Sequence, residues 1–238
     1  FNDAISWSGG LFNNWLDTDN GFTDNPHQII GRFTWLPYLS EDENELFHLG
    51  IGMRFSNSEV DLHYKSTPEF YISPTFIDSG TLNANSSFTY NLEASWRKGP
   101  LWISSEYTET NIDSPEQGDP TLSGYYISAA LSLTGEMREF YQRNATYSAL
   151  AVSQSVEQGG LGAWELTSRW SVFDGNSGQL NSGKTEIFSL GLFWWLNPKF
   201  NISLNYRWLH LEGCSLLNSS CDLVGNSNGM NLRLMMML

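Results

Sequence analysis

The chain has 238 residues, with 12 Lys+Arg against 26 Asp+Glu, and a formal net charge of −14 at pH 7. This acidic balance excludes nucleic-acid binding through bulk electrostatics, which needs a basic surface. Aromatic residues make up 14% of the chain and charged residues only 16%, so the composition also excludes a disordered chain, because such chains are poor in aromatic residues. The most apolar stretch, 187–196, is too short for a membrane-spanning helix. The composition that remains is apolar residues mixed with uncharged polar ones, which is typical of strands that face lipid on one side and water on the other.

Apolar and polar residues alternate with a period of two in ten segments, which places successive side chains on opposite faces of a strand. The segment 164–172 shows this most clearly, with Trp164 and Trp170 on one face and Glu165 and Arg169 on the other. In chain order the predicted strands contain residues 5–11, 33–35, 49–55, 88–96, 101–107, 125–133, 164–172, 188–196, 200–208 and 230–238. Many of these segments approach the ~9–11 residues that a tilted membrane strand needs.

The connections between the predicted strands differ in length between the two ends of the sheet. Short turns are expected at 37–44, 97–100 and 197–198, and long connections rich in Asn, Ser and Gly at 16–25, 56–87, 110–120, 174–183 and 212–228. Transmembrane barrels have this asymmetry, with short periplasmic turns and long outer loops, and it places the C-terminus on the periplasmic side. The long connection 135–160 falls where a short turn is expected. The spacing of Glu136, Met137, Phe140 and Tyr141 is compatible with a short helix there.

Tryptophan residues recur near the ends of the predicted strands, for example Trp35, Trp96 and Trp208. Rings at these positions are typical of the aromatic girdles at a membrane–water boundary. A soluble sandwich or barrel would show the same alternation, but its polar face would carry many Lys, Glu and Arg residues, whereas here Ser, Thr, Asn and Gly predominate. The expected fold class is therefore all-β, an antiparallel transmembrane β-barrel in contact with outer-membrane lipid.

Short motifs along nearly the whole chain resemble, in the same order, the outer-membrane porin family O/P, whose best-known members are selective for phosphate and polyphosphate. In the first part of the chain they are Gly31-Arg32-Phe33-Thr34-Trp35-Leu36-Pro37, His48-Leu49-Gly50, Asp78-Ser79-Gly80 and Leu133-Thr134-Gly135-Glu136. In the second part they are Gly162-Ala163-Trp164-Glu165-Leu166, Arg169-Trp170-Ser171, Leu190-Gly191-Leu192, Trp195-Leu196-Asn197-Pro198 and Asn205-Tyr206. The resemblance implies a sixteen-stranded, usually trimeric barrel in a Gram-negative outer membrane, with a constriction loop folded inward from its N-terminal half.

Ten predicted strands against sixteen in that family indicate that residues 1–238 are a single β-barrel domain that lacks about six N-terminal strands. The start at Phe1, without a signal-like segment, favours this interpretation. On this interpretation the constriction loop of the family lies outside the sequence. A self-contained ten-stranded barrel is the alternative. The final residue, Leu238, departs from the aromatic residue that usually ends outer-membrane barrels.

The polar faces of the predicted strands carry five of the eight arginines. We expect the ion pathway to be lined by Arg32, Arg54, Glu93, Glu106, Glu165, Arg169, Asn205, Arg207 and Arg233. Guanidinium groups present fixed forks to phosphate oxygens, so the arginines are candidates for an anion ladder of the kind used by known members of the family. The alternative is that they pair with acidic residues of the lumen such as Glu93, Glu106 and Glu165. The net charge favours this pairing and leaves phosphate selectivity open.

No pattern in the sequence indicates catalysis, a cofactor or a metal site. The histidines His27, His48, His63 and His210 are scattered, and no two have the spacing of a metal motif. We therefore expect a passive diffusion channel for small hydrophilic solutes or ions rather than an enzyme. The alternative function is that of a rim hydrolase or an adhesin on a ten-stranded barrel, and His210 near Glu212 is the one candidate catalytic pair.

Two cysteines, Cys214 and Cys221, lie close together in a stretch rich in Ser and Asn. A local disulfide between them would suit an oxidising compartment. Two separate thiols are the alternative.

Overall fold

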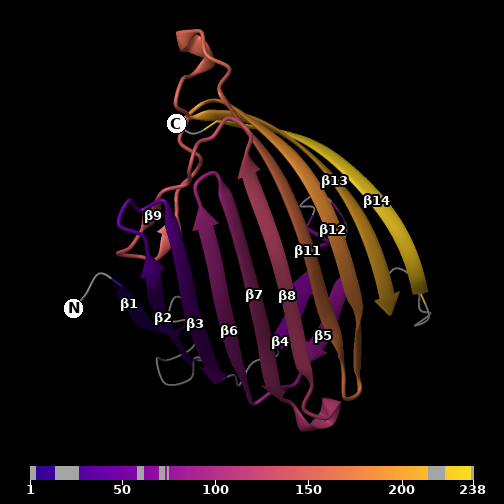
Figure 1. Cartoon of the computed structure of the whole chain (residues 1–238). Helices are drawn as coiled ribbons and strands as arrows, with labels where there is room; N and C mark the ends of the chain where they lie inside the picture. The colour runs from indigo at the N-terminus through magenta and orange to yellow at the C-terminus, as the bar shows by residue number, and fades with distance from the viewer. Residues whose placement is uncertain are drawn as a thin grey trace.

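The protein is described by a computed structural model that covers residues 4–13, 27–57, 62–69, 73, 75–213 and 223–236. Its main feature is a ten-stranded antiparallel sheet with the strand order β1-β2-β3-β6-β7-β8-β11-β12-β13-β14 (Figure 1). These strands are β1 (Ile5–Asn13), β2 (His27–Leu39), β3 (Glu45–Asn57), β6 (Ser86–Lys98), β7 (Leu101–Asp113), β8 (Thr121–Ser132), β11 (Ala163–Ser177), β12 (Leu180–Asn197), β13 (Phe200–Gly213) and β14 (Leu223–Met236). Each contains or overlaps one predicted segment, so the expected strands and the all-β class are confirmed.

The sheet is strongly curved, as the arc of ribbons in Figure 1 shows. Each strand pairs with its neighbour in the sheet, so the order follows the chain once two small hairpins are set aside. In the described part of the chain, β1 and β14 are the two edges and do not pair with each other. The sheet therefore has the architecture of a barrel wall that is open along one side.

The two faces of the sheet differ in polarity in a way that is the reverse of a soluble protein. On β13, Leu204 and Trp208 are 43% and 42% exposed, whereas Asn201 and Ser203 on the opposite face are each 2% exposed. We call the face with the exposed apolar side chains the outer face and the other the inner face. Exposed apolar rows are unfavourable in water and expected against lipid. Among the described residues, no helix is long enough and apolar enough to cross a bilayer.

The turns confirm part of the predicted connection pattern and correct one element of it. The sheet is joined by short turns at 40–44, 99–100 and 198–199. The long loop expected at 174–183 is wrong, because β11 and β12 continue there and pair up to a two-residue turn at Gly178 and Gln179. Gly178 has φ of 61°, a left-handed conformation that tight hairpin turns require and glycine adopts without strain.

The helix considered for 136–141 is also wrong. The segment is extended and forms a small hairpin of β9 (Phe140–Tyr141) and β10 (Thr146–Tyr147), followed by the 3-10 helix η2 (Val156–Gln158). Tertiary packing accounts for this difference, because the rings of Phe140 and Tyr147 lie 5.0 Å apart and both contact side chains of the inner face. A second hairpin, β4 (Leu62–Ser66) and β5 (Ile77–Leu82), interrupts the connection between β3 and β6.

Candidate functional site

The hairpin β4–β5 folds back onto the inner face of the sheet instead of extending away from it. Its end is fixed by apolar packing, since Leu82 and Ala84 form a buried cluster with Ile112 of β7 and Leu122 of β8. Ile112 and Leu122 belong to the inner face, so the hairpin occupies space inside the curve of the wall. The sequence pattern predicted no inserted hairpin, because the constriction loop of the family was expected to lie outside the chain.

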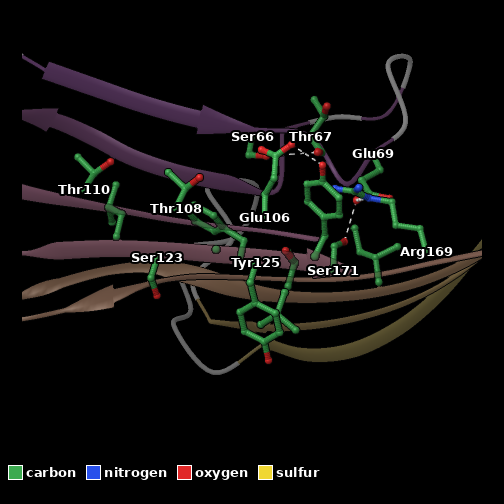
Figure 2. Close-up of a pocket in the computed structure, with 17 residues that line it drawn as sticks. Ser66, Thr67, Glu69, Glu106, Thr108, Thr110, Ser123, Tyr125, Arg169 and Ser171 are labelled. Atoms are coloured by element: carbon green, nitrogen blue, oxygen red, sulfur yellow. Dashed lines mark hydrogen bonds and ion pairs between the residues drawn. The ribbon is translucent and has the colours of Figure 1, made fainter. Parts of the chain in front are cut away.

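The turn that follows β4 carries a carboxylate to the wall. Glu69 accepts hydrogen bonds through Oε1 from Arg169 Nε at 2.8 Å and from Ser171 Oγ at 2.7 Å. The Arg169 guanidinium lies over the ring of Tyr126, 3.6 Å from its centroid. Figure 2 shows Glu69 of the turn lying next to Arg169 and Ser171 of β11. A contact between residues about one hundred positions apart thus connects the inserted hairpin to the sheet.

A cavity of about 320 Å³ separates the hairpin from the wall beside this contact. It is lined mainly by hydroxyl-bearing and aromatic residues together with three charged ones, Glu69, Glu106 and Arg169. Glu106 accepts a hydrogen bond from Tyr126 Oη at 2.5 Å and another from Asn91 Nδ2 at 3.3 Å. The lining of the cavity is therefore largely polar but has no excess of positive charge.

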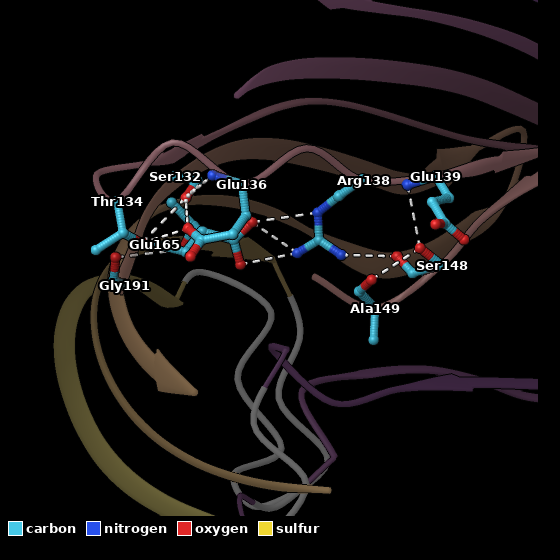
Figure 3. Close-up of polar contacts among 10 residues, drawn as sticks. Ser132, Thr134, Glu136, Arg138, Glu139, Ser148, Ala149, Glu165 and Gly191 are labelled. Atoms are coloured by element: carbon cyan, nitrogen blue, oxygen red, sulfur yellow. Dashed lines mark hydrogen bonds and ion pairs between the residues drawn. The ribbon is translucent and has the colours of Figure 1, made fainter. Parts of the chain in front are cut away.

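A second segment, 136–150, also lies against the inner face. Its main anchor is Arg138, whose Nη2 lies 2.7 Å and 2.8 Å from the two carboxylate oxygens of Glu165 on β11. Glu165 is only 2% exposed, and the guanidinium also lies 5.4 Å from the ring centroid of Trp102. Figure 3 shows the ion pair together with the hydrogen bond from Arg138 Nη1 to the carbonyl of Ser148. A charged pair this deeply buried fixes the segment to the wall.

The start of this second segment is held by a hydrogen-bonded carboxylate. Glu136 accepts hydrogen bonds from Thr134 Oγ1 and, at 2.8 Å, from Ser132 Oγ. Burial opposes ionisation of Glu136, but these hydrogen bonds outweigh it and hold the pKa of the carboxyl below its usual value.

Arg32 of β2 attaches the segment 136–150 to a different part of the inner face. Its Nε and Nη2 donate to the carboxylate of Glu93 on β6 at 2.6 Å and 2.7 Å, and further N–H groups donate to the carbonyls of Asn144 and Ala145 at 3.0 Å and 3.3 Å. The intervening strand β3 has Gly50 at this place, and a Cβ there would come within 2.7 Å of Glu93 Cδ. The glycine gives the ion pair room to lie across β3.

A further arginine that the sequence analysis did not select completes the attachment. Arg97 is 3% exposed and donates to the backbone carbonyls of Arg138, at 2.7 Å, and of Glu43. The alternation of β6 was the available signal for Arg97, because it continues the row of Glu93 and Ser95. No comparable signal existed for Arg138 or Glu69, which lie in connections where the period-two pattern stops.

The predicted pore-lining residues all lie on strands of the ten-stranded sheet, and the structure brings only some of them together. Arg32 meets Glu93, and Arg169 and Glu106 share contacts with Tyr126. The others are distributed as follows: Arg54 Nε donates to Gln28 at 3.2 Å, Arg207 donates to Asn231, Asn205 lies beside Gly191, and Arg233 Nη2 lies 3.6 Å from Met235 Sδ. Their role along an ion pathway stays a prediction.

The candidate pair His210 and Glu212 is in contact, with 3.0 Å between Nε2 and Oε1, and His210 Nδ1 lies 2.8 Å from Asn226. The hollow around His210 also contains Phe188 and Trp208 of the outer face, and the described residues that line it include no Ser, Thr or Cys, the nucleophiles of Ser–His and Cys–His hydrolases. In the part of the chain that the structure covers, no cluster of three or more His, Cys, Asp or Glu could hold a metal ion.

The disulfide considered for Cys214 and Cys221 lies outside the described residues.

A curved antiparallel sheet with an apolar outer face and a polar inner face, onto which two connecting segments fold, is the architecture of a membrane channel wall of the porin class. Residues 48–238 match the family model described as phosphate-selective porin O and P. The chain therefore belongs to this family, and membership supports an outer-membrane porin.

Two curated relatives are similar to the chain. A protein of Caulobacter vibrioides that carries no functional name is 25% identical over 241 residues, which covers 95% of this chain and 48% of that protein. Porin O of Pseudomonas aeruginosa is 25% identical over 151 residues, which covers 59% of this chain and 31% of Porin O. The chain thus spans no more than about half the length of these relatives.

Proposed function

We propose that the chain forms a large part of the wall of a water-filled channel through which small hydrophilic solutes or ions diffuse passively. The observation that carries this proposal is the pair of segments that fold onto the inner face, held there by Arg169–Glu69 and Arg138–Glu165. Segments attached to the polar side of such a wall narrow an aqueous path without closing the apolar side that faces lipid. The arrangement supports a channel rather than an enzyme.

The closed barrel that this function requires includes more than the described sheet. Edge strands with unpaired backbone groups are not tolerated in lipid, so additional strands connect β1 to β14. We take residues 1–238 as one barrel domain that is the C-terminal part of a larger barrel, in agreement with the greater length of the relatives. The C-terminus then lies on the periplasmic side, and the full-length protein forms a homotrimer, which cross-linking in native outer membranes tests.

Selectivity in this channel is mild. Three arginines of the inner face and its inserted segments are paired with carboxylates: Arg32 with Glu93, Arg138 with Glu165 and Arg169 with Glu69. Each pair removes one positive charge from the field that a solute meets. Phosphate is therefore one permeant anion among several, although the family name refers to phosphate.

Planar-bilayer recording on the full-length protein tests this function. We expect stepwise conductance increases in KCl, a small reversal potential in a chloride gradient and little block by added inorganic phosphate. In the same assay, a variant with Arg169→Gln and Arg207→Gln should become more cation-selective by a modest factor. Absence of conductance steps from correctly inserted protein would overturn the channel, and strong anion selectivity with phosphate block of the wild type would overturn mild selectivity.

A further inference from the structure

The contact between Glu69 and the wall has the chemistry of an occupied anion site. One oxygen of the Glu69 carboxylate receives an N–H from Arg169 and an O–H from Ser171, at 2.8 Å and 2.7 Å. Proteins hold phosphate and other small oxyanions in the same way, with a guanidinium N–H and a hydroxyl that donate to one oxygen. The site is filled by the protein's own carboxylate.

Arg169 has a contact with the wall besides its ion pair with Glu69. The Arg169 guanidinium lies over Tyr126, and the phenol of Tyr126 is in turn hydrogen-bonded to Glu106 at 2.5 Å. Arg169 and Ser171 are two positions apart on β11 and both belong to the inner face. Both donors therefore belong to the wall, and they border the cavity of about 320 Å³ described above.

Glu69, in contrast, is held in an unfavourable backbone conformation. Its φ is 50°, in the left-handed region that residues other than glycine rarely adopt, and such conformations persist only where surrounding contacts maintain them. Its N–H donates to the carbonyl of Thr67 at 2.8 Å. The turn is therefore shaped to deliver this carboxylate to Arg169.

We propose that Glu69 is a specificity-determining residue that suppresses anion selectivity by occupying the oxyanion site of Arg169 and Ser171. The proposal rests on the proposed channel function. With the Glu69 carboxylate in place, the pair adds no net charge to the lumen and leaves no donor for a solute anion at this point. Without it, Arg169 contributes a full positive charge, and the two donors bind a small oxyanion from solution.

The test is a comparison of reversal potentials in a KCl gradient for the full-length wild type and Glu69→Gln. Glu69→Gln should raise the ratio of chloride to potassium permeability by up to about 25-fold. One unit charge about 4 Å away changes the local concentration of a monovalent ion by about fivefold in a water-like dielectric, and the change is upward for the anion and downward for the cation. Inorganic phosphate should then block the chloride current of Glu69→Gln and not that of the wild type. Adding Arg169→Gln to this variant should abolish the block, and adding Ser171→Ala should weaken it.

Two controls keep the result specific. Glu116→Gln removes one negative charge from an exposed turn and should leave the permeability ratio unchanged. Arg169→Gln alone leaves the Glu69 carboxylate without its ion-pair partner and should shift the permeability ratio toward cations. A contact that only holds the hairpin, away from the path of the ions, would leave the ratio unchanged.

Failure of the inference is distinct from failure of the channel. Wild-type conductance steps together with a permeability ratio of Glu69→Gln equal to that of Glu116→Gln would overturn the role of Glu69 and leave the channel intact. If the Glu69→Gln protein does not insert into the bilayer, the permeability ratio of Arg169→Gln is the deciding measurement. If that ratio does not shift toward cations, the proposal is overturned.

Discussion

The buried ion pair of Arg138 and Glu165 offers a sharp test of how the inserted segment 136–150 is held. Glu165→Gln keeps the shape of the side chain and one hydrogen-bond acceptor but removes the charge that balances the Arg138 guanidinium. Glu165 is 2% exposed and the Arg138 side chain 17% exposed, so little water is available to replace the lost carboxylate. Breaking a buried pair by removing one partner costs about 3–5 kcal/mol, and we expect Glu165→Gln to lower the free energy of unfolding by that amount.

The matched control is an exposed ion pair of the same sheet. Lys98 Nζ lies 3.1 Å from Glu45 Oε2, with side chains 58% and 27% exposed, and such pairs contribute about 0–1 kcal/mol. Denaturant unfolding of the full-length protein in lipid vesicles, followed by tryptophan fluorescence, should therefore separate Glu165→Gln from Glu45→Gln. A double-mutant cycle with Arg138→Gln isolates the pair from other effects. Equal losses for the two single variants, or no coupling in the cycle, would refute the account of Arg138 as the main anchor.

The remaining predictions concern strand register and one turn. Leu204→Arg on the outer face should cost about 2–4 kcal/mol in the same unfolding assay, whereas Asn205→Asp on the inner face should be nearly neutral. In a background without the native cysteines, Asn205→Cys should react with a membrane-impermeant thiol reagent and Leu204→Cys should not; the opposite pattern would contradict the register. Gly162→Ala should lower stability by about 1–3 kcal/mol, because Gly162 has φ of 68° and its new Cβ would overlap the Trp195 carbonyl. Gly80→Ala should lower stability by less, because Gly80 has a similar φ of 65° but nothing lies within 4 Å of the added Cβ.

The strands were predictable from the sequence because lipid and water impose opposite requirements on the two faces of one strand. Beyond the apolar zone both faces meet water, so the requirement for alternation ends although the backbone pairing continues. This explains why Asn176 and Asn181, which pair across β11 and β12, were assigned to a loop. The helix prediction for 136–141 was wrong for a different reason. The apolar residues of this segment are spaced for packing onto the inner face, where the Phe140 ring lies 5.5 Å from that of His48.

Only those residues of the candidate site that lie on strands could be predicted from the sequence. Alternation placed Arg169 and Glu165 on the inner face, but their partners Glu69 and Arg138 come from connections. A residue in a connection has no periodic neighbour that fixes its direction, and the first of these contacts joins residues about one hundred positions apart. Opposite charge alone could not choose among the many acidic residues of this chain.

The inner-face arginines show why counting cations does not determine what a channel selects. Arg32 and Arg97 direct N–H groups at backbone carbonyls of the inserted segment, and Arg138, within that segment, directs its N–H groups at Glu165 and at a neighbouring carbonyl. Donors used in this way hold the inserted segment in place and are no longer available to an anion. A guanidinium contributes to anion passage only if its charge is uncompensated and its donors face the lumen. At Arg169 a single carboxylate compensates the charge and occupies the Nε donor, which is why we propose that the contact with Glu69, rather than the number of arginines alone, limits the preference of the channel for anions.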